Sequence, residues 1–306
     1  MPIPKFYEMM LPLLELCSDH QEHSLKDAEE MIAQKFHLTE EEKNELLASG
    51  TQRRLYNRIT WAKQYLVKAK LLEKVGRSSF KITERGINVL KDNPQMIDIN
   101  YLKQFPEFLE FINKSLSESN EIDYNDNDSW QIQISKTPEE SLDEAYSKMI
   151  DNLSEEILER IKTVSPSRFE RIVIELLVKM GYGGSLKEAG QVVGKSGDEG
   201  IDGIIKEDKL GLDFIYIQAK RWENVVSRPE IQKFAGALLG KKSRKGIFIT
   251  TSRFSKEAEE YAQSIDAKII LIDGKKLAQL MIEYNLGTTT VNIYEIKKID
   301  QDYFED

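Results

Sequence analysis

Gly197-Asp-Glu-Gly-Ile-Asp-Gly203 and Ile215-Tyr-Ile-Gln-Ala-Lys-Arg-Trp222 are the two most informative segments of this 306-residue chain. Turn-forming residues at 207–213 predict that the two segments are the strands of one hairpin. Such a hairpin brings Asp202, near the end of the first segment, beside the second strand. An acid, an amide and a lysine would then lie close together.

Gln218 and Lys220 are two residues apart in the second strand, so they lie on the same face of it. Cleavage of a phosphodiester requires neutralised charge on the phosphate, an activated water and a stabilised leaving oxygen. Mg²⁺ held by oxygen ligands supplies the first, and a nearby lysine can orient or deprotonate the water. We therefore expect Asp202 and the uncharged Gln218 to hold Mg²⁺, and Lys220 to orient the water or stabilise charge.

The distribution of cysteine and histidine excludes most other catalytic chemistry. The single cysteine, Cys17, cannot form an internal disulfide, which suits a reducing compartment. Neither Cys nor His occurs beyond residue 40; the three histidines are His20, His23 and His37. The rest of the chain therefore cannot hold a Ser-His-Asp triad or a Cys/His zinc site, and catalysis there must use carboxylates, amides and lysines.

The second half of the chain is predicted to be an α/β domain with a mixed sheet flanked by helices. Apolar residues recur at helical spacing from Phe169 to Met180, and Gly181 ends that helix. Strands are expected at 190–194, 201–205, 214–222, 246–251 and 268–272, and helices at 229–239, 256–265 and 275–284. The strands near residues 248 and 270 are apolar throughout, as expected where helices cover both faces of a sheet.

The first hundred residues contain the most basic region of the chain. Although the net charge is −9, residues 51–85 carry 10 Lys and Arg against 2 Asp and Glu. Helices are expected at 4–17, 24–36, 52–70 and 84–90, with a hairpin at 71–83. A basic helix followed by a basic-tipped hairpin is the layout of a winged helix-turn-helix, in which the helix enters the major groove and the wing contacts phosphate. The expected DNA-binding residues are Arg53, Arg54, Arg58, Lys63 and Arg77. The alternative is a small helical interaction domain with a solvated charged face.

The length of the chain corresponds to about two domains. Residues 96–160 carry 5 basic against 16 acidic residues, and the polar run at 116–140 is expected to be an interdomain linker that leads into a bridging helix. We therefore predict a DNA-binding domain at 1–95, an acidic linker and bridging helix at 96–160, and a catalytic domain at 161–306. No stretch approaches the ~18 apolar residues of a membrane-spanning helix and no signal peptide is evident, so a cytoplasmic protein with no membrane partner is expected.

The hairpin and its surroundings resemble the PD-(D/E)XK nuclease core, and in particular the Mrr family of modification-dependent (type IV) restriction endonucleases. The resemblance spans about residues 166–284, and the winged-helix prediction agrees with that family's DNA-binding domain. The matching residues are Phe169-Glu170, Gly181-Tyr182, Gly197 to Gly203, Gln218-Ala-Lys-Arg221, Phe248-Ile-Thr-Thr251 and Leu271-Ile-Asp-Gly274. Gln218 stands where an acid is commoner in the superfamily, but glutamine at this place is familiar in the Mrr branch.

The resemblance adds Glu170, on the first helix of the catalytic domain, as a catalytic acid. The alternative is that Ser167 and Glu170 form a capping box. For Asp198 and Glu199 a polar loop before the strand is favoured over a role in the site.

Two further expectations concern the residues after the catalytic strand. Residues 220–245 carry 8 basic and 2 acidic residues, so Lys241 and Lys242 are candidate phosphate contacts, with a solvated loop as the alternative. Trp222 is expected to anchor the hairpin in the core rather than to stack on a base.

The leading hypothesis is a Mg²⁺-dependent DNA endonuclease. The resemblance implies that its substrate is methylated or otherwise modified foreign double-stranded DNA and that its role is restriction. Because duplex cleavage needs two active sites, a homodimer or higher homo-oligomer is expected. One alternative is a DNA-binding regulator with an inactive nuclease fold, and another is a repair or junction-resolving nuclease.

Overall fold

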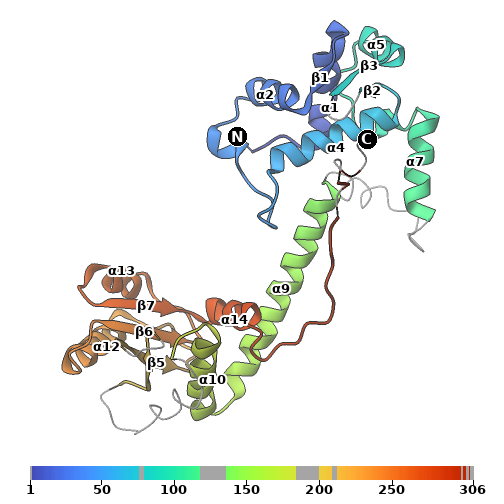
Figure 1. Cartoon of the computed structure of the whole chain (residues 1–306). Helices are drawn as coiled ribbons and strands as arrows, with labels where there is room; N and C mark the ends of the chain where they lie inside the picture. Colours follow the sequence, from blue (N-terminus) through green and yellow to red (C-terminus); the bar gives the residue numbers. More distant parts are fainter. Residues whose placement is uncertain are drawn as a thin grey trace. The chain divides into compact units, whose positions relative to one another are not determined.

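The computed structural model describes residues 2–75, 79–117, 136–183, 200–208, 212–297, 299–300 and 303. The chain divides into two compact units, Met1–Ser147 and Lys148–Asp306, each with its own apolar core (Figure 1). Among the described residues, no helix has both the length and the apolar character needed to cross a membrane.

The first unit packs helices against a small antiparallel sheet. Its helices are η1 (Phe6–Met9), α1 (Met10–Leu16), η2 (Cys17–Asp19), α2 (Leu25–Lys35), α3 (Glu40–Lys43), α4 (Arg54–Lys68), α5 (Glu84–Lys91), α6 (Ile99–Leu102) and α7 (Pro106–Ser117). Its strands are β1 (His23–Ser24), β2 (Leu72–Val75) and β3 (Ser79–Ile82), in the order β1-β3-β2. The expected helix and hairpin at 52–83 are therefore present. The hairpin tip, with Arg77, lies outside the described residues.

The core of the first unit extends beyond the boundary expected at residue 95. Ile99 and Leu102 of α6 and Phe108 of α7 are buried in it, and the Phe108 ring contacts Tyr65 of α4 edge-on at 5.5 Å between centroids. The prediction of a linker rested on the acidic composition of 96–160 as a whole and not on the positions of these apolar residues. The start of the segment interpreted as a linker is thus packed structure, and the acidic run at 118–135 lies outside the described residues.

The second unit is an α/β structure. Helix α9 (Pro138–Thr163) leads into it and is followed by α10 (Pro166–Lys179), β4 (Gly203–Lys206), β5 (Phe214–Lys220), α12 (Arg228–Gly240), β6 (Lys245–Thr250), α13 (Lys256–Ser264), β7 (Lys268–Ile272) and α14 (Gly274–Glu283). The strand order is β4-β5-β6-β7; β4 and β5 are antiparallel, and the other neighbours are parallel. The predicted mixed sheet is confirmed, while the strand expected at 190–194 falls outside the described residues.

Helices cover both faces of this sheet (Figure 1). Ile217 and Ile249 are buried in a cluster with residues of α10 and α14, whereas Phe248, on the opposite face, is buried against α12 and α13. Alternate residues of a strand point to opposite faces, so residues 247–249 of β6 must all be apolar to satisfy both cores. This packing fixes β5 and β6 side by side with their carboxyl ends at the same edge.

Candidate active site

The β4–β5 hairpin places Asp202 beside the residues expected to act with it. The strands pair Gly203 with Ile217, and the backbone N–H of Asp202 extends the ladder by donating to the Ile217 carbonyl at 2.8 Å. The Asp202 Oδ2 atom then accepts the backbone N–H of Ala219 at 2.8 Å and the side-chain amide of Gln218. Two donors on one oxygen fix the orientation of this carboxylate.

The amide of Gln218 is held in a confined place. Gln218 is 3% exposed, and a Cβ added at Gly200 would lie 3.0 Å from Gln218 Oε1. Gly200 also has a φ of +92°, which L side chains rarely adopt. Glycine at this position therefore satisfies both the turn before β4 and the close approach of Gln218.

Glu170 joins the site from α10. The side chain of Ser165 accepts the Arg168 N–H at 3.2 Å and caps this helix, so the alternative capping box of Ser167 with Glu170 is wrong. Partial burial raises the pKa of the Glu170 carboxyl, the negative charge of Asp202 raises it further, and Lys220 acts in the opposite direction. Glu170 is thus close enough to Asp202 and Lys220 to interact with them electrostatically, although it lies more than 30 residues before them in the sequence.

The donor set fits a magnesium ion. The described residues contain no cluster of three or more Asp, Glu, His or Cys side chains, but Mg²⁺ keeps several waters and commonly uses only one or two carboxylates plus substrate phosphate. Asp202 and Glu170 supply two carboxylates, and a divalent cation would offset the repulsion that raises the Glu170 pKa. Gln218 here directs its N–H at Asp202, so it orients that carboxylate; Asp198 and Glu199 lie outside the described residues.

Three hydroxyl side chains, the last residue of β6 and the two that follow it, hold the end of β5 and the chain that leaves it. Thr250 Oγ1 donates to the Lys220 carbonyl at 2.9 Å, Thr251 Oγ1 to the Trp222 carbonyl at 2.8 Å, and Ser252 Oγ to the Glu223 carbonyl at 3.0 Å. We call Thr250, Thr251 and Ser252 the hydroxyl clamp. Thr250 and Thr251 belong to the motif shared with the Mrr family, but no role was predicted for them; the available signal was three consecutive hydroxyl residues at the end of a buried strand.

The expectation that Trp222 anchors the hairpin in the core is wrong. Trp222 is 37% exposed, and the Nζ of Lys220 lies 5.6 Å from the centroid of its ring. The chain turns directly after β5, where the Trp222 N–H donates to the Lys220 carbonyl at 3.0 Å, and this turn brings the exposed indole ring beside the ammonium group of Lys220.

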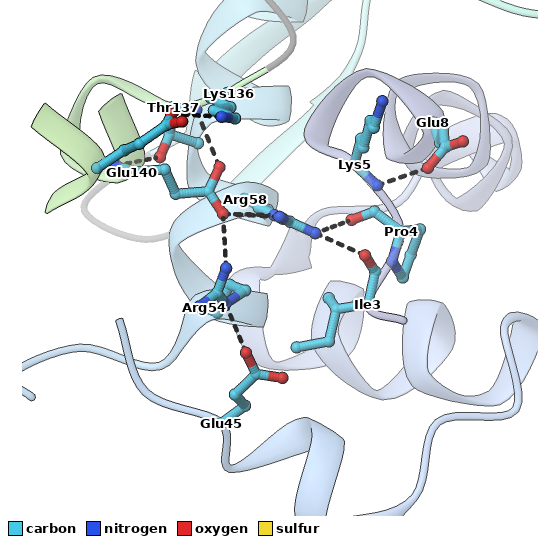
Figure 2. A network of polar contacts seen from close by, with 11 residues as sticks. Ile3, Pro4, Lys5, Glu8, Glu45, Arg54, Arg58, Lys136, Thr137 and Glu140 are labelled. Atoms are coloured by element: carbon cyan, nitrogen blue, oxygen red, sulfur yellow. Dashed lines mark hydrogen bonds and ion pairs between the residues drawn. The ribbon is translucent and has the colours of Figure 1, made fainter. Parts of the chain in front are cut away.

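Two arginines of α4 are paired with carboxylates of the first unit (Figure 2). Arg58 Nε and Nη2 lie 2.8 Å and 2.7 Å from Glu140 Oε1, and its Nη1 donates to the carbonyls of Ile3 and Pro4. Arg54 lies 2.8 Å from Glu45 and 3.7 Å from the same Glu140 oxygen. These two candidate DNA contacts are engaged with carboxylates in the described conformation.

The remaining candidate DNA contacts differ in their surroundings. Arg53 forms an ion pair with Glu29 at 2.5 Å, and Lys63 lies over the Phe80 ring. Burial lowers the pKa of Lys63, and the charge of Lys74 lowers it further. In the second unit, Lys241 ends α12 and Lys242 is exposed with a φ of +56°.

Comparison with known proteins gives matches over both units. The sequence matches the Mrr N-terminal domain over residues 6–92 and a restriction endonuclease family over residues 161–281. It is 36% identical over 313 residues to the type IV methyl-directed restriction enzyme EcoKMrr of Escherichia coli (strain K12), with 100% of both chains covered.

Two solved structures are also similar. One is the MspJI restriction endonuclease in complex with a 27-mer oligonucleotide, at 20% identity and a TM-score of 0.27, covering 48% of this chain and 32% of that one. The other is the DNA modification-dependent restriction endonuclease AspBHI, at 14% identity and a TM-score of 0.36, covering 71% of this chain and 56% of that one. The chain thus spans about a third and just over half of their lengths.

Proposed function

This chain belongs to the Mrr family of restriction endonucleases and is an endodeoxyribonuclease, and from that premise we propose that it hydrolyses phosphodiester bonds of methylated or otherwise modified DNA with Mg²⁺. The supporting observation is the meeting of Asp202, Gln218 and Lys220 at one end of the hairpin, with Glu170 near enough to share their electrostatic field. The 36% identical relative is described as methyl-directed, which supports the choice of modified DNA.

We assign the roles within this site as follows. Asp202 and Glu170 hold Mg²⁺, which neutralises charge on the scissile phosphate when bound. Gln218 fixes the Asp202 carboxylate through its amide N–H. Lys220 orients the attacking water or stabilises the developing charge with its ammonium group.

We propose that the first unit is a winged helix that binds double-stranded DNA through α4 and the β2–β3 hairpin. The arginines of α4 are paired with carboxylates, so DNA phosphates must replace Glu140, Glu45 and Glu29 for Arg58, Arg54 and Arg53 to serve as contacts. Lys63, Arg77, Lys241 and Lys242 complete the proposed set. Because cleavage of both strands needs two active sites, we expect a homodimer or larger assembly. We propose that it acts in the cytoplasm.

The test compares the full chain with its Asp202→Ala variant on methylated and unmethylated plasmids, with and without Mg²⁺. Cleavage confined to methylated plasmid, to Mg²⁺ and to the intact Asp202 is the expected result. Cleavage of both plasmids would contradict dependence on DNA modification and would favour a repair or junction-resolving nuclease. Absence of cleavage on every substrate, with DNA binding retained, would favour a DNA-binding regulator.

A further inference from the structure

A pocket of about 450 Å³ lies at the carboxyl ends of β5 and β6. It is lined by Lys162, Arg221, Trp222, Glu223, Asn224 and Thr251, all of them in the second unit. Trp222 gives the pocket an exposed aromatic surface, and the same ring contacts the ammonium group of Lys220. The pocket therefore adjoins the candidate active site without sharing its acidic residues.

The wall of this pocket is a built structure rather than a mobile loop. The hydroxyl clamp binds the carbonyls of Lys220, Trp222 and Glu223, and Thr251 of the clamp is 2% exposed. On the other side, Arg221 Nη1 donates to the Lys162 carbonyl at 2.5 Å, which ties the wall to the last turn of α9. These bonds fix the backbone of the wall and the Arg221 side chain, which reduces the conformational entropy that ligand binding would cost.

One polar atom in the wall has no partner within the described part of the chain. The Nε of Arg221 is buried and makes no hydrogen bond there. An unsatisfied buried donor costs free energy, so the described protein groups leave the hydrogen-bonding capacity of this guanidinium incompletely used. A phosphate oxygen is an acceptor that guanidinium groups bind well.

The chemistry of the lining matches one nucleotide of a DNA strand. The indole face of Trp222 can stack on a base, and stacking on an aromatic side chain tolerates every base because each has a π face. Lys162 and Arg221 carry two positive charges against the single negative charge of Glu223, which favours a phosphate.

The spacing agrees with a position next to the cleaved bond. Lys220 Nζ lies 5.6 Å from the centre of the Trp222 ring, so these two side chains can contact neighbouring nucleotides of one strand. A phosphate at Lys220 and the adjoining nucleotide at Trp222 would thus follow one another along the strand.

We propose that this pocket is a subsite for the nucleotide adjacent to the scissile phosphate, with Trp222 stacking on its base or sugar and Lys162 and Arg221 binding its phosphate. The assignment rests on the proposed nuclease function, because the scissile phosphate is what the neighbouring Lys220 would contact. Trp222 and Lys162 act here as substrate-positioning residues.

The first test measures binding of single-stranded DNA, whose bases are free to stack, by the full chain in the cleavage-deficient Asp202→Ala background, with fluorescence anisotropy as the readout. Trp222→Leu removes the aromatic face and is expected to raise Kd about ten-fold, within the range for loss of one base–aromatic stack. Trp222→Phe keeps an aromatic face and is expected to recover most of the affinity. Equal Kd values for the three proteins, each verified as folded by thermal melting, would overturn the subsite.

The second test compares two lysine substitutions. Lys162→Met is expected to reduce the slope of log Kd against log salt by about 1, the value for one lost phosphate contact. Lys256→Met is the matched control, because this lysine is 84% exposed on α13 and does not line the pocket. An equal change of slope in both variants would overturn a specific phosphate contact at Lys162.

The two proposals can fail separately. Plasmid cleavage by the unmodified chain, combined with unchanged binding by Trp222→Leu and Lys162→Met, leaves the nuclease function and refutes the subsite. Weaker binding by both variants, combined with no cleavage by the unmodified chain, leaves the nucleotide subsite and refutes the nuclease function.

Discussion

The side chains of the candidate site contribute in two ways. Some are held in place by hydrogen bonds, and others act through their charge. The orientation of Asp202 is fixed by the N–H groups of Gln218 and Ala219 before any ligand binds. Lys220 and Glu170 are assigned to the group that acts through charge, since the charge of Lys220 opposes the rise that burial and Asp202 cause in the pKa of Glu170. Preorganised groups of this kind stabilise a transition state without reorganising during the reaction.

Replacement of the site lysine is expected to separate cleavage from binding. Lys220→Ala removes the ammonium group that orients water or stabilises charge, so single-turnover cleavage should fall by about 10²–10⁴-fold. DNA binding, measured by anisotropy, should remain within a few-fold because the phosphate contacts outside the site are intact. Cleavage by Lys220→Ala at the rate of the unmodified chain would contradict the role assigned to Lys220.

Neutralisation of Glu170 is expected to stabilise the protein while reducing cleavage. The pKa of Glu170 is raised above its ordinary value of 4.5, so the folded state holds the proton more tightly than the unfolded state. The free energy of unfolding therefore falls as pH rises above 4.5, because the unfolded state releases the proton more readily. Glu170→Gln cannot ionise, so the variant does not lose this stability.

The check is urea unfolding without divalent metal ions at pH 7 and at a pH below 4.5. Glu170→Gln should be more stable than the unmodified chain at pH 7 and should gain little at the lower pH, where the carboxyl is protonated in both states. A lower stability of Glu170→Gln at pH 7 would show that the carboxylate has a favourable partner that outweighs burial and Asp202.

Among the secondary-structure elements, the first turn of α9 has an unusual attachment. Glu140 is 7% exposed. Its Oε2 accepts a hydrogen bond from the Thr137 N–H at 3.1 Å, and its Oε1 accepts one from Arg58 Nε at 2.8 Å (Figure 2). In the same turn, Glu139 accepts the indole N–H of Trp61 at 2.7 Å. The start of this helix is therefore joined to α4 by two carboxylates.

Loss of the Arg58 side chain is expected to destabilise the first unit. Arg58→Ala leaves Glu140 buried without its main charged partner, and breaking a buried pair in this way costs about 3 kcal/mol. The matched control is Arg160→Ala, whose ion pair with Glu156 is 78% and 55% exposed and should contribute less than about 1 kcal/mol. Equal losses in urea unfolding would contradict a special role for the Arg58 pair.

The first residue of α14 is expected to tolerate no side chain. A Cβ at Gly274 would lie 2.5 Å from the Thr251 carbonyl oxygen and 2.9 Å from Leu158 Cδ1, so Gly274→Ala must displace α14 from β6. We expect a loss of about 1–3 kcal/mol in the free energy of unfolding.

Gly236→Ala in α12 is the matched control for this substitution. A Cβ at Gly236 meets no atom within 4 Å, so alanine there should stabilise the helix by up to about 1 kcal/mol. Opposite signs for the two alanine variants in urea unfolding are the expected outcome. A stabilising effect of Gly274→Ala would contradict the tight packing of α14 on the end of β6.

At the level of the whole molecule, the described residues of the two units bury separate apolar clusters, one in the first unit and one on each face of the sheet in the second. The units Met1–Ser147 and Lys148–Asp306 each bury their own set of apolar residues. Separate cores are the physical basis of separate unfolding transitions.

Calorimetry of the full chain should therefore resolve two unfolding transitions. Arg58→Ala is expected to lower the temperature of one, and Gly274→Ala that of the other, because each substitution acts within a different core. A single transition that both variants shift equally would show that the two units unfold as one cooperative block.

The sequence alone predicted the described strands of the second unit and the centre of the candidate site, because both predictions depend on local periodicity. Alternation and turn residues predicted β4 and β5, and the two-residue spacing put Gln218 and Lys220 on one face. The same local signals predicted α4, the hairpin after it and the mixed sheet.

Only the tertiary structure decided which distant groups meet. Arg58 and Glu140 are 82 residues apart, and Glu170 approaches Asp202 only because α10 packs on the sheet. The packing of 96–117 on the first core, the exposure of Trp222 and the hydroxyl clamp have the same origin. Each depends on contacts between segments that lie far apart in the chain, and neither the composition nor the periodicity of one segment specifies its partner.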